Sequence, residues 1–256
     1  MAARFLELSR RAYENNYVTR TDFLTLNEQA MLEDMRMGRL SGTTERLSPS
    51  KVVLYGGFPD AERKAAFFLP DYMEEEDVPK DEIACLKISP LQRQFADELT
   101  HRDYLGALMN LGIERDLIGD ILLDRTQAEA WIFVVAERAN IIENELTRVK
   151  HTSVSVKSEN AENCHVRPEY DERSGSVASE RTDAVLAFVY RLSRGKAQEL
   201  ISREAVSVDG RIISSAGQTL KEGSRVSVKG FGKFIFDGIE KETKKGRLFV
   251  RVRIFK

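Results

Sequence analysis

The spacing of apolar residues predicts helices at the start of the chain. Near the N-terminus they recur at helical spacing, at Phe5, Leu8 and Ala12. A second helical pattern runs through Leu26 and Met35, and either Thr21 or Asp22 is its predicted N-cap. Gly38 is the predicted stop. The turn-rich stretch from 41 to 49 then indicates a boundary, so residues 1–48 are interpreted as a helical N-terminal region.

From Lys51 onward short apolar runs replace the helical pattern. Predicted strands cover 52–55, 65–69, 84–88, 120–123, 130–135 and 152–157. Between them, Thr100 to Asp103 resembles a capping box that opens one helix, and Glu137 to Val149 forms another. Short strands alternating with two helices predict an α+β fold of the RRM-like, split βαβ type for residues 49–157.

The segment that follows is polar and poor in apolar residues. Pro168 and Gly175 interrupt it, so residues 158–180 are predicted to be a linker. The predicted organisation is therefore a helical region at 1–48, an α+β domain at 49–157, a linker at 158–180 and a final domain at 181–256.

Residues 181–256 show a third pattern, two helices followed by hairpins. Thr182 is the predicted cap of the first helix, and Ser193 is the predicted cap of the second. The Asp209-Gly210 pair fits a type I′ turn between two short strands. A last hairpin is predicted from 234–236 and 248–254, around the residues at 244–246.

Charge is distributed unevenly along the chain. The whole sequence has 39 Lys+Arg, 41 Asp+Glu and a net charge of -2. Residues 181–256 contain 17 basic and 8 acidic residues, a net charge of +9, which leaves −11 for residues 1–180. A small basic module attached to an acidic body is a candidate polyanion binder. The near-zero total therefore does not argue against nucleic-acid binding.

The motifs of the basic module resemble the S4 RNA-binding domain from Arg181 to Lys229. The matching positions are Arg181, Asp183, Leu192, Ser193, Arg194, Ala197, Gln198, Leu200, Ile201, Val206, Val208 and Gly210. Arg194 and Gln198 lie one turn apart on the second helix, whose N-terminus offers N–H groups suited to phosphate. The predicted RNA-binding residues are Arg181, Arg191, Ser193, Arg194, Lys196, Gln198, Arg203, Lys229 and Lys233. Recognition is expected to depend mainly on RNA shape.

Two readings stay open for the aromatic residues among these basic positions. Lys229, Phe231, Lys233 and Phe234 interleave charge with aromatic rings, as base-stacking surfaces do. Alternate phenylalanines in a hairpin are, however, common in a hydrophobic core.

No catalytic motif emerges. In the string Gly246-Arg247-Leu248 the next residue is Phe249, so the carboxylate that pseudouridine synthases use is missing. His101-Arg102-Asp103 resembles a kinase catalytic loop, but its Asn spacing is wrong and a helix cap explains it better. Cys85 and Cys164 are isolated, without metal-ligand spacing. We expect no enzymatic activity, no cofactor and no metal.

Three strings outside the S4 region resemble the YlmH family of bacterial S4-domain proteins. They are the residues at 54–58, 99–108 and 118–121. The resemblance implies binding to the large ribosomal subunit through rRNA, with peptidyl-tRNA as a further candidate, and a role in ribosome rescue or translation quality control. There is no apolar run of 18 residues, so no membrane segment is expected. We expect a cytoplasmic protein that is monomeric.

Two alternatives remain beside this reading. One is an RNA-modifying enzyme with an unrecognised site within residues 51–157. The other is an adaptor linked to cell division, whose interface is the acidic body. Within the middle domain, His101, Arg102 and Arg115 are candidates for a second RNA contact.

Overall fold

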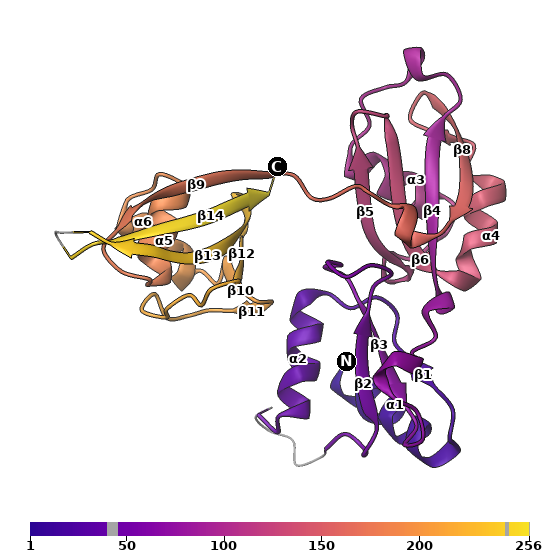
Figure 1. The fold of residues 1–256 in the computed structure, drawn as a ribbon, viewed down its shortest axis with the longest axis horizontal. Helices are drawn as coiled ribbons and strands as arrows, with labels where there is room; N and C mark the ends of the chain where they lie inside the picture. Colours follow the sequence, from indigo (N-terminus) through magenta and orange to yellow (C-terminus); the bar gives the residue numbers. More distant parts are fainter. Residues whose placement is uncertain (40–45, 244–245, 256) are drawn as a thin grey trace. The chain divides into compact units, whose positions relative to one another are not determined.

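The computed structural model describes residues 1–39, 46–243 and 246–255. Two expected turns, at 41–44 and at 244–245, lie outside the described residues. The chain forms two compact units, Met1–Arg167 and Pro168–Lys256, which are described separately (Figure 1).

The first unit begins with two helices and a small sheet. Its elements are α1 (Ala2–Asn15), β1 (Thr19–Arg20), α2 (Leu26–Arg36), β2 (Lys51–Tyr55) and β3 (Ala65–Leu69). The strands are antiparallel in the order β1-β3-β2, so the predicted boundary at residue 48 crosses a continuous sheet. The predicted cap of the second helix is also wrong. Thr25 caps α2 in a capping box with Glu28, whereas the Thr21 hydroxyl accepts a hydrogen bond from the Ala66 backbone.

The second half of this unit has the predicted split βαβ arrangement. Its elements are β4 (Ile83–Pro90), α3 (His101–Asn110), β5 (Ile118–Asp124), β6 (Glu129–Val135), α4 (Ala136–Glu145), β7 (Arg148–Val149) and β8 (Thr152–Glu159). The antiparallel order β5-β6-β4-β8-β7 places the first and third strands at the centre. The helix predicted to reach Val149 ends at Glu145, because Arg148 and Val149 pair with β8. Short 3-10 turns complete the unit at Glu75–Asp77, Lys80–Glu82, Arg93–Phe95, Arg115–Leu117 and Ala161–Asn163.

Both faces of the β4–β8 sheet are covered. Helices α3 and α4 pack on the side chains of Leu86, Ile132 and their neighbours. The other face, with Trp131 and Phe133, packs against Phe67 and further residues of the N-terminal part. This burial makes residues 1–167 one folded unit.

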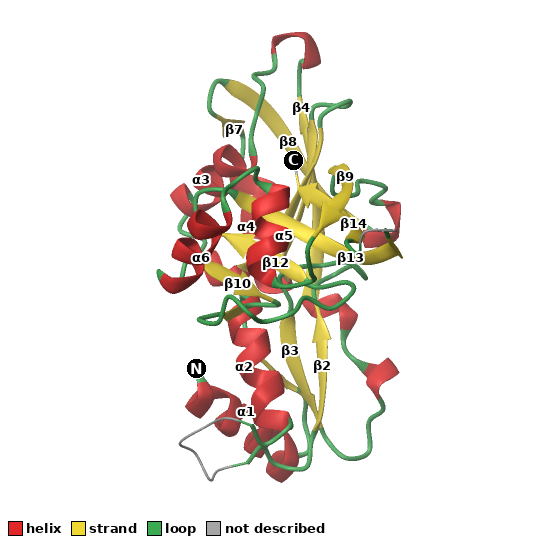
Figure 2. Ribbon diagram, turned by 90° about the vertical axis from the view of Figure 1, so that its left-hand side faces the viewer, coloured by secondary structure: helices red, strands yellow, loops and turns green. Residues whose placement is uncertain are grey.

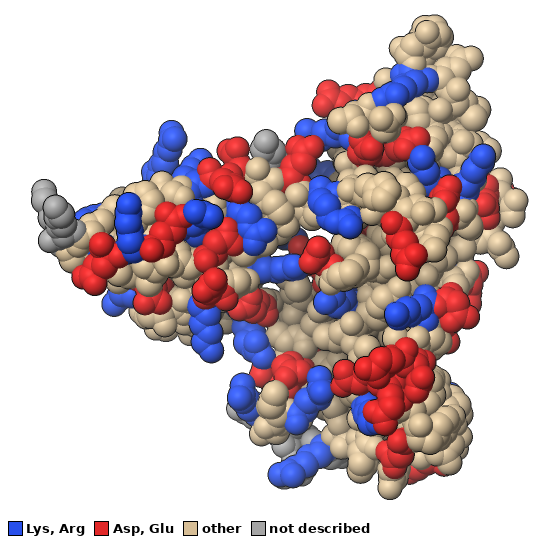
Figure 3. All heavy atoms as spheres, viewed as in Figure 1, with Lys and Arg blue, Asp and Glu red and all other residues tan. Residues whose placement is uncertain are grey.

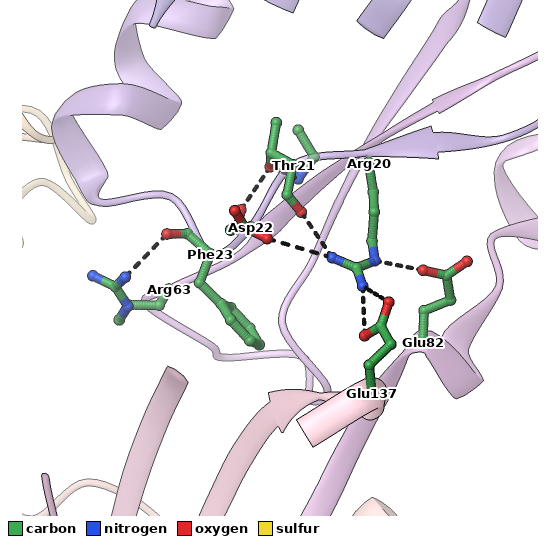
Figure 4. A network of polar contacts seen from close by, with 8 residues as sticks. Arg20, Thr21, Asp22, Phe23, Arg63, Glu82 and Glu137 are labelled. Carbon is green, nitrogen blue, oxygen red and sulfur yellow. Dashed lines mark hydrogen bonds and ion pairs between the residues drawn. The ribbon is translucent and has the colours of Figure 1, made fainter. Parts of the chain in front are cut away.

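Polar contacts fix the same junction, as Figure 4 shows around Arg20 and Arg63. The Arg63 guanidinium donates to the carbonyl oxygens of Ile118 at 2.9 Å and Phe23 at 3.0 Å. The Asp120 carboxylate accepts from the backbone N–H of Arg63 at 3.2 Å. Arg20 forms ion pairs with Glu82 and Glu137. The contacts of Arg63 and Asp120 thus satisfy part-buried backbone groups where the two sheets meet.

The second unit is a twisted sheet with two helices on one side (Figure 2). Its elements are β9 (Tyr170–Val177), α5 (Thr182–Val189), α6 (Arg194–Ser202), β10 (Val206–Val208), β11 (Arg211–Ile212), β12 (Arg225–Val228), β13 (Gly232–Glu242) and β14 (Leu248–Phe255). The strand order is β11-β10-β12-β13-β14-β9. The predicted Asp209-Gly210 turn is present, with φ angles of 49° and 80° as a type I′ turn requires.

The predicted linker at 158–180 is wrong for most of its length. Strand β8 continues to Glu159, and β9 pairs with all eight residues of β14. The segment is polar because β9 is an edge strand, and Val177 is its one fully buried residue. The second unit therefore has 18 Lys+Arg and 12 Asp+Glu, a net charge of +6, and the first unit has −8.

Candidate nucleic-acid interface

A polar cluster of the second unit surrounds Asp183, near the start of α5. Its side chain has 0% exposure. The carboxylate accepts hydrogen bonds from Arg181 Nε and Nη2, both at 3.2 Å, and from Arg194 Nη2 at 2.9 and 3.1 Å. Gln198 Nε2 donates a further hydrogen bond at 2.8 Å. One buried carboxylate thus orients three predicted RNA-binding side chains.

The cluster also sets the charge state of this carboxylate. Burial alone would raise the pKa of Asp183, but the hydrogen bonds from Arg181, Gln198 and Arg194 outweigh it and hold the pKa at about 2. Asp183 is therefore ionised at neutral pH and keeps both guanidinium groups in place.

The two arginines remain accessible despite this contact. The side chains of Arg181 and Arg194 are 42% and 49% exposed. A guanidinium has five N–H donors, and contact with Asp183 leaves others free for solvent or a phosphate. The sequence predicted that Arg194 and Gln198 share a helix face, and the structure shows that this face turns toward Asp183. The sequence did not single out Asp183 as the residue that orients these side chains, although the Arg-x-Asp motif contains it.

The rest of α6 is partly neutralised. Ser193 is the N-cap, and its hydroxyl accepts from the Lys196 backbone N–H at 3.2 Å. Glu199 pairs with Lys196 at 2.9 Å and with Arg203 at 2.7 Å, and these contacts lower the pKa of Glu199. Lys196 and Arg203 therefore add less net charge than a count of basic residues suggests.

The remaining predicted contacts lie elsewhere in the unit. Arg191 is exposed between α5 and α6, with a φ of 54°. Lys229 is exposed at the end of β12, and Lys233 is half-buried in β13 opposite Ser227. All nine predicted residues remain predictions as RNA contacts, but the structure joins Arg181, Arg194 and Gln198 in one cluster.

The outer face of the sheet is less suited to RNA. Figure 3 shows acidic and basic side chains interspersed over this face of the second unit. Arg253 pairs with Asp237 at 2.8 Å, and Arg251 pairs with Glu240. The helix side, with the Asp183 cluster, is therefore the better candidate interface.

In the middle domain the three candidate RNA contacts do not form one site. Arg115 is half-buried and donates to the Ile118 carbonyl at 2.6 Å, which is a structural role. His101 and Arg102 are exposed at the start of α3. RRM domains bind RNA with aromatic residues on the open sheet face, but here Trp131 is 7% exposed and Phe133 is fully buried. RNA contact through this sheet is therefore not available.

The side chains that resemble catalytic groups have structural roles or low reactivity. Asp103 accepts hydrogen bonds from the Thr100 backbone N–H and hydroxyl at 2.8 and 2.7 Å, as a helix cap does. Burial raises the pKa of Cys85 to about 12, which makes its thiol a poor nucleophile. Within residues 1–39, 46–243 and 246–255, no three His, Cys, Asp or Glu side chains gather as metal ligands. No helix in those ranges is long and apolar enough to cross a membrane.

Comparison with known proteins gives two family matches. Residues 81–163 match the domain described as "Putative RNA-binding domain in YlmH", and residues 181–226 match the S4 domain. A relative from Bacillus subtilis, the ribosome-associated protein quality control protein P2, is 29% identical over 246 residues, with 94% of this chain and 89% of the relative covered. Among solved structures, the cell division protein ylmH from Streptococcus pneumoniae is 24% identical. That likeness covers 62% of this chain and 88% of the solved one, with a TM-score of 0.47.

Proposed function

The chain is a YlmH-type S4-domain protein, as its motifs predicted, and from that premise we propose that it binds the large ribosomal subunit through rRNA. Peptidyl-tRNA is a second contact in this proposal, and the role is ribosome rescue or translation quality control. The protein acts as a cytoplasmic monomer and catalyses no reaction.

The RNA-binding part of the proposal rests on one observation. The Asp183 carboxylate holds the guanidinium groups of Arg181 and Arg194 in fixed positions. Arginine in a preorganised orientation loses less side-chain entropy when it binds a phosphate than a free lysine does. Asp183 is fully buried, so it holds Arg181 and Arg194 while their outer edges face solvent. This arrangement fits the phosphate backbone of a shaped RNA.

The name of the Bacillus subtilis relative supports the ribosomal part. That protein is described as ribosome-associated and as acting in protein quality control, and the two chains match over nearly their whole lengths. The two RNA-binding family matches fall in the same region of similarity. A ribosome-associated role is therefore the function that sequence and geometry support together.

Crosslinking in cells, followed by sequencing of the bound RNA, tests this proposal. Large-subunit rRNA should dominate the crosslinked reads, with tRNA as a minor class. The double variant Arg181→Ala/Arg194→Ala should lose the rRNA reads and the tRNA reads. The control is Arg39→Ala, which removes an exposed arginine of the acidic unit and should keep them. Reads that follow general RNA abundance would contradict the proposal.

Nucleoside mass spectrometry after incubation with rRNA tests the enzyme alternative, and a new modified nucleoside would favour it.

A further inference from the structure

The turn between β12 and β13 exposes an aromatic ring. Phe231 lies between Gly230 and Gly232, and it is 40% exposed. Phe234, three residues later, is 0% exposed and belongs to the core. The structure thus separates two phenylalanines that the sequence pattern could not separate.

The Phe231 ring is supported from within the unit. Its centroid lies 5.3 Å from that of Tyr190, which in turn lies 6.0 Å from the buried Phe234 ring. Burial raises the pKa of Tyr190 to about 12, and its hydroxyl is the one buried side-chain oxygen or nitrogen without a partner in the described parts of the chain. Packing rather than hydrogen bonding therefore holds Tyr190 under Phe231.

Glycine conformations and backbone hydrogen bonds define the turn that exposes this ring. Gly230 and Gly232 have φ angles of 84° and 104°, which side-chain-bearing residues rarely adopt. The Phe231 N–H donates to the Val228 carbonyl at 3.0 Å, and the Lys229 N–H donates to the Ala205 carbonyl at 2.8 Å. The turn is therefore hydrogen-bonded to the residue that directly precedes β10.

Two cationic residues lie close to Phe231 and Tyr190 in the sequence. Lys229 precedes Phe231 by two residues, and Arg191 follows Tyr190 directly. Both side chains are exposed, and neither has a hydrogen-bond or ion-pair partner among the residues that the structure describes. An exposed aromatic ring with cationic residues close by in the chain is the combination that binds single-stranded nucleic acid, because bases stack on the ring while phosphates contact the cations.

We propose that Phe231 stacks on an unpaired nucleobase of the bound RNA, with Lys229 and Arg191 contacting the adjoining phosphates. This rests on the proposed RNA binding and goes beyond it. The second unit then distinguishes a helix with an unpaired nucleotide from a regular duplex, in addition to contacting the backbone at the Asp183 cluster.

The test compares two labelled RNA hairpins that differ by a single bulged adenosine, with binding to the full chain followed by fluorescence anisotropy. Stacking on one aromatic side chain corresponds to a gain in affinity of roughly 5- to 140-fold. The wild-type chain should prefer the bulged hairpin by a factor in this range. Phe231→Leu keeps an apolar cover on Tyr190 but lacks the π-face, and it should lose the preference, whereas Phe231→Trp should retain it.

Two controls separate this proposal from RNA binding in general. Ile239→Ala removes an exposed apolar side chain elsewhere, in β13, and should leave the preference unchanged. Arg194→Ala should weaken binding to both hairpins by the same factor. Equal wild-type affinity for the two hairpins, or a preference that persists in Phe231→Leu, would overturn the stacking proposal alone. Failure of the wild-type chain to bind either hairpin would overturn the proposed function as well.

Discussion

The buried Asp183 carboxylate and the Arg194 guanidinium, on neighbouring helices, contact each other at 2.9 Å. Arg194 is half exposed, so the same side chain joins α5 to α6 and presents a positive charge to solvent. Arg194 therefore contributes to the fold and, in the proposed function, to RNA binding, so variants of this cluster need two independent readouts.

Replacing Arg194 should lower both the stability of the second unit and its RNA affinity, whereas replacing Lys196 should lower the RNA affinity alone. Arg194→Ala removes hydrogen bonds to a buried carboxylate and should destabilise the second unit by roughly 1–3 kcal/mol. Lys196 makes a surface ion pair with Glu199, so Lys196→Ala should change stability by less than about 0.5 kcal/mol. Thermal unfolding of each full-length variant measures this difference.

RNA titrations at several salt concentrations complete the comparison. Each of the two variants should bind RNA more weakly, with a salt slope lower by about 1 than that of the wild type. Unchanged affinity in both variants would exclude this helix face as the interface.

Acid should destabilise the second unit over a defined pH range. The native pKa of Asp183 is about 2, below the value of about 3.9 in an unfolded chain. A lowered native pKa stabilises the fold above the unfolded pKa, and this contribution disappears as the pH falls from about 4 to 2. Asp183→Asn should flatten the pH dependence of unfolding in this range and lower stability at pH 7. An unaltered pH profile in the variant would show that the cluster contributes little.

Two glycines of the first unit should respond oppositely to alanine. Gly57 has a φ of +95°, and an added Cβ would lie 2.3 Å from the Phe133 ring. Gly57→Ala should therefore cost more than roughly 2 kcal/mol. Gly106 lies within α3 with nothing within 4 Å of an added Cβ, so Gly106→Ala should stabilise the unit by up to about 1 kcal/mol. Fluorescence of the single tryptophan, Trp131, reports denaturant unfolding of this unit. Equal effects would contradict the packing described at the sheet junction.

The acidic first unit should reduce non-specific RNA binding. Residues 168–256 carry +6, and residues 1–167 carry −8. The isolated fragment 168–256 should bind RNA of random sequence more tightly than the full chain at low salt. The reason is that the negative charge of residues 1–167 repels the RNA backbone and is missing from the fragment. A fragment that starts at 181 lacks β9 and should unfold at a lower temperature, since it exposes the edge of β14. Equal RNA affinity of the full chain and the 168–256 fragment would show that the acidic unit has no such effect.

Local signals explain what the sequence predicted correctly. The Ser193 hydroxyl caps α6 by accepting from the Lys196 N–H, three residues further along the chain. The Asp209-Gly210 turn likewise depends on adjacent residues. The split βαβ order also follows from alternating short elements with two helices. The cap and the turn depend on contacts close together in the sequence, whereas the split βαβ order was predicted from the succession of elements although its strands pair over long distances.

Long-range pairing explains what the sequence did not predict. Strand β9 depends on β14, which lies far along the chain, so its polar composition alone resembled a linker. The pairing of β1 with β3 likewise crosses the boundary that turn residues indicated. Periodicity placed Arg194 on a helix face, but the direction of that face depended on where Asp183 lies in the fold.

Sedimentation of the full chain with ribosomal subunits through a density gradient is the most direct test of the proposed function. At low salt the wild-type chain should move with the large subunit, and raised salt should release it because phosphate contacts dominate. Arg194→Ala should be released at a lower salt concentration. A wild-type chain that stays at the top of the gradient at low salt would contradict the account.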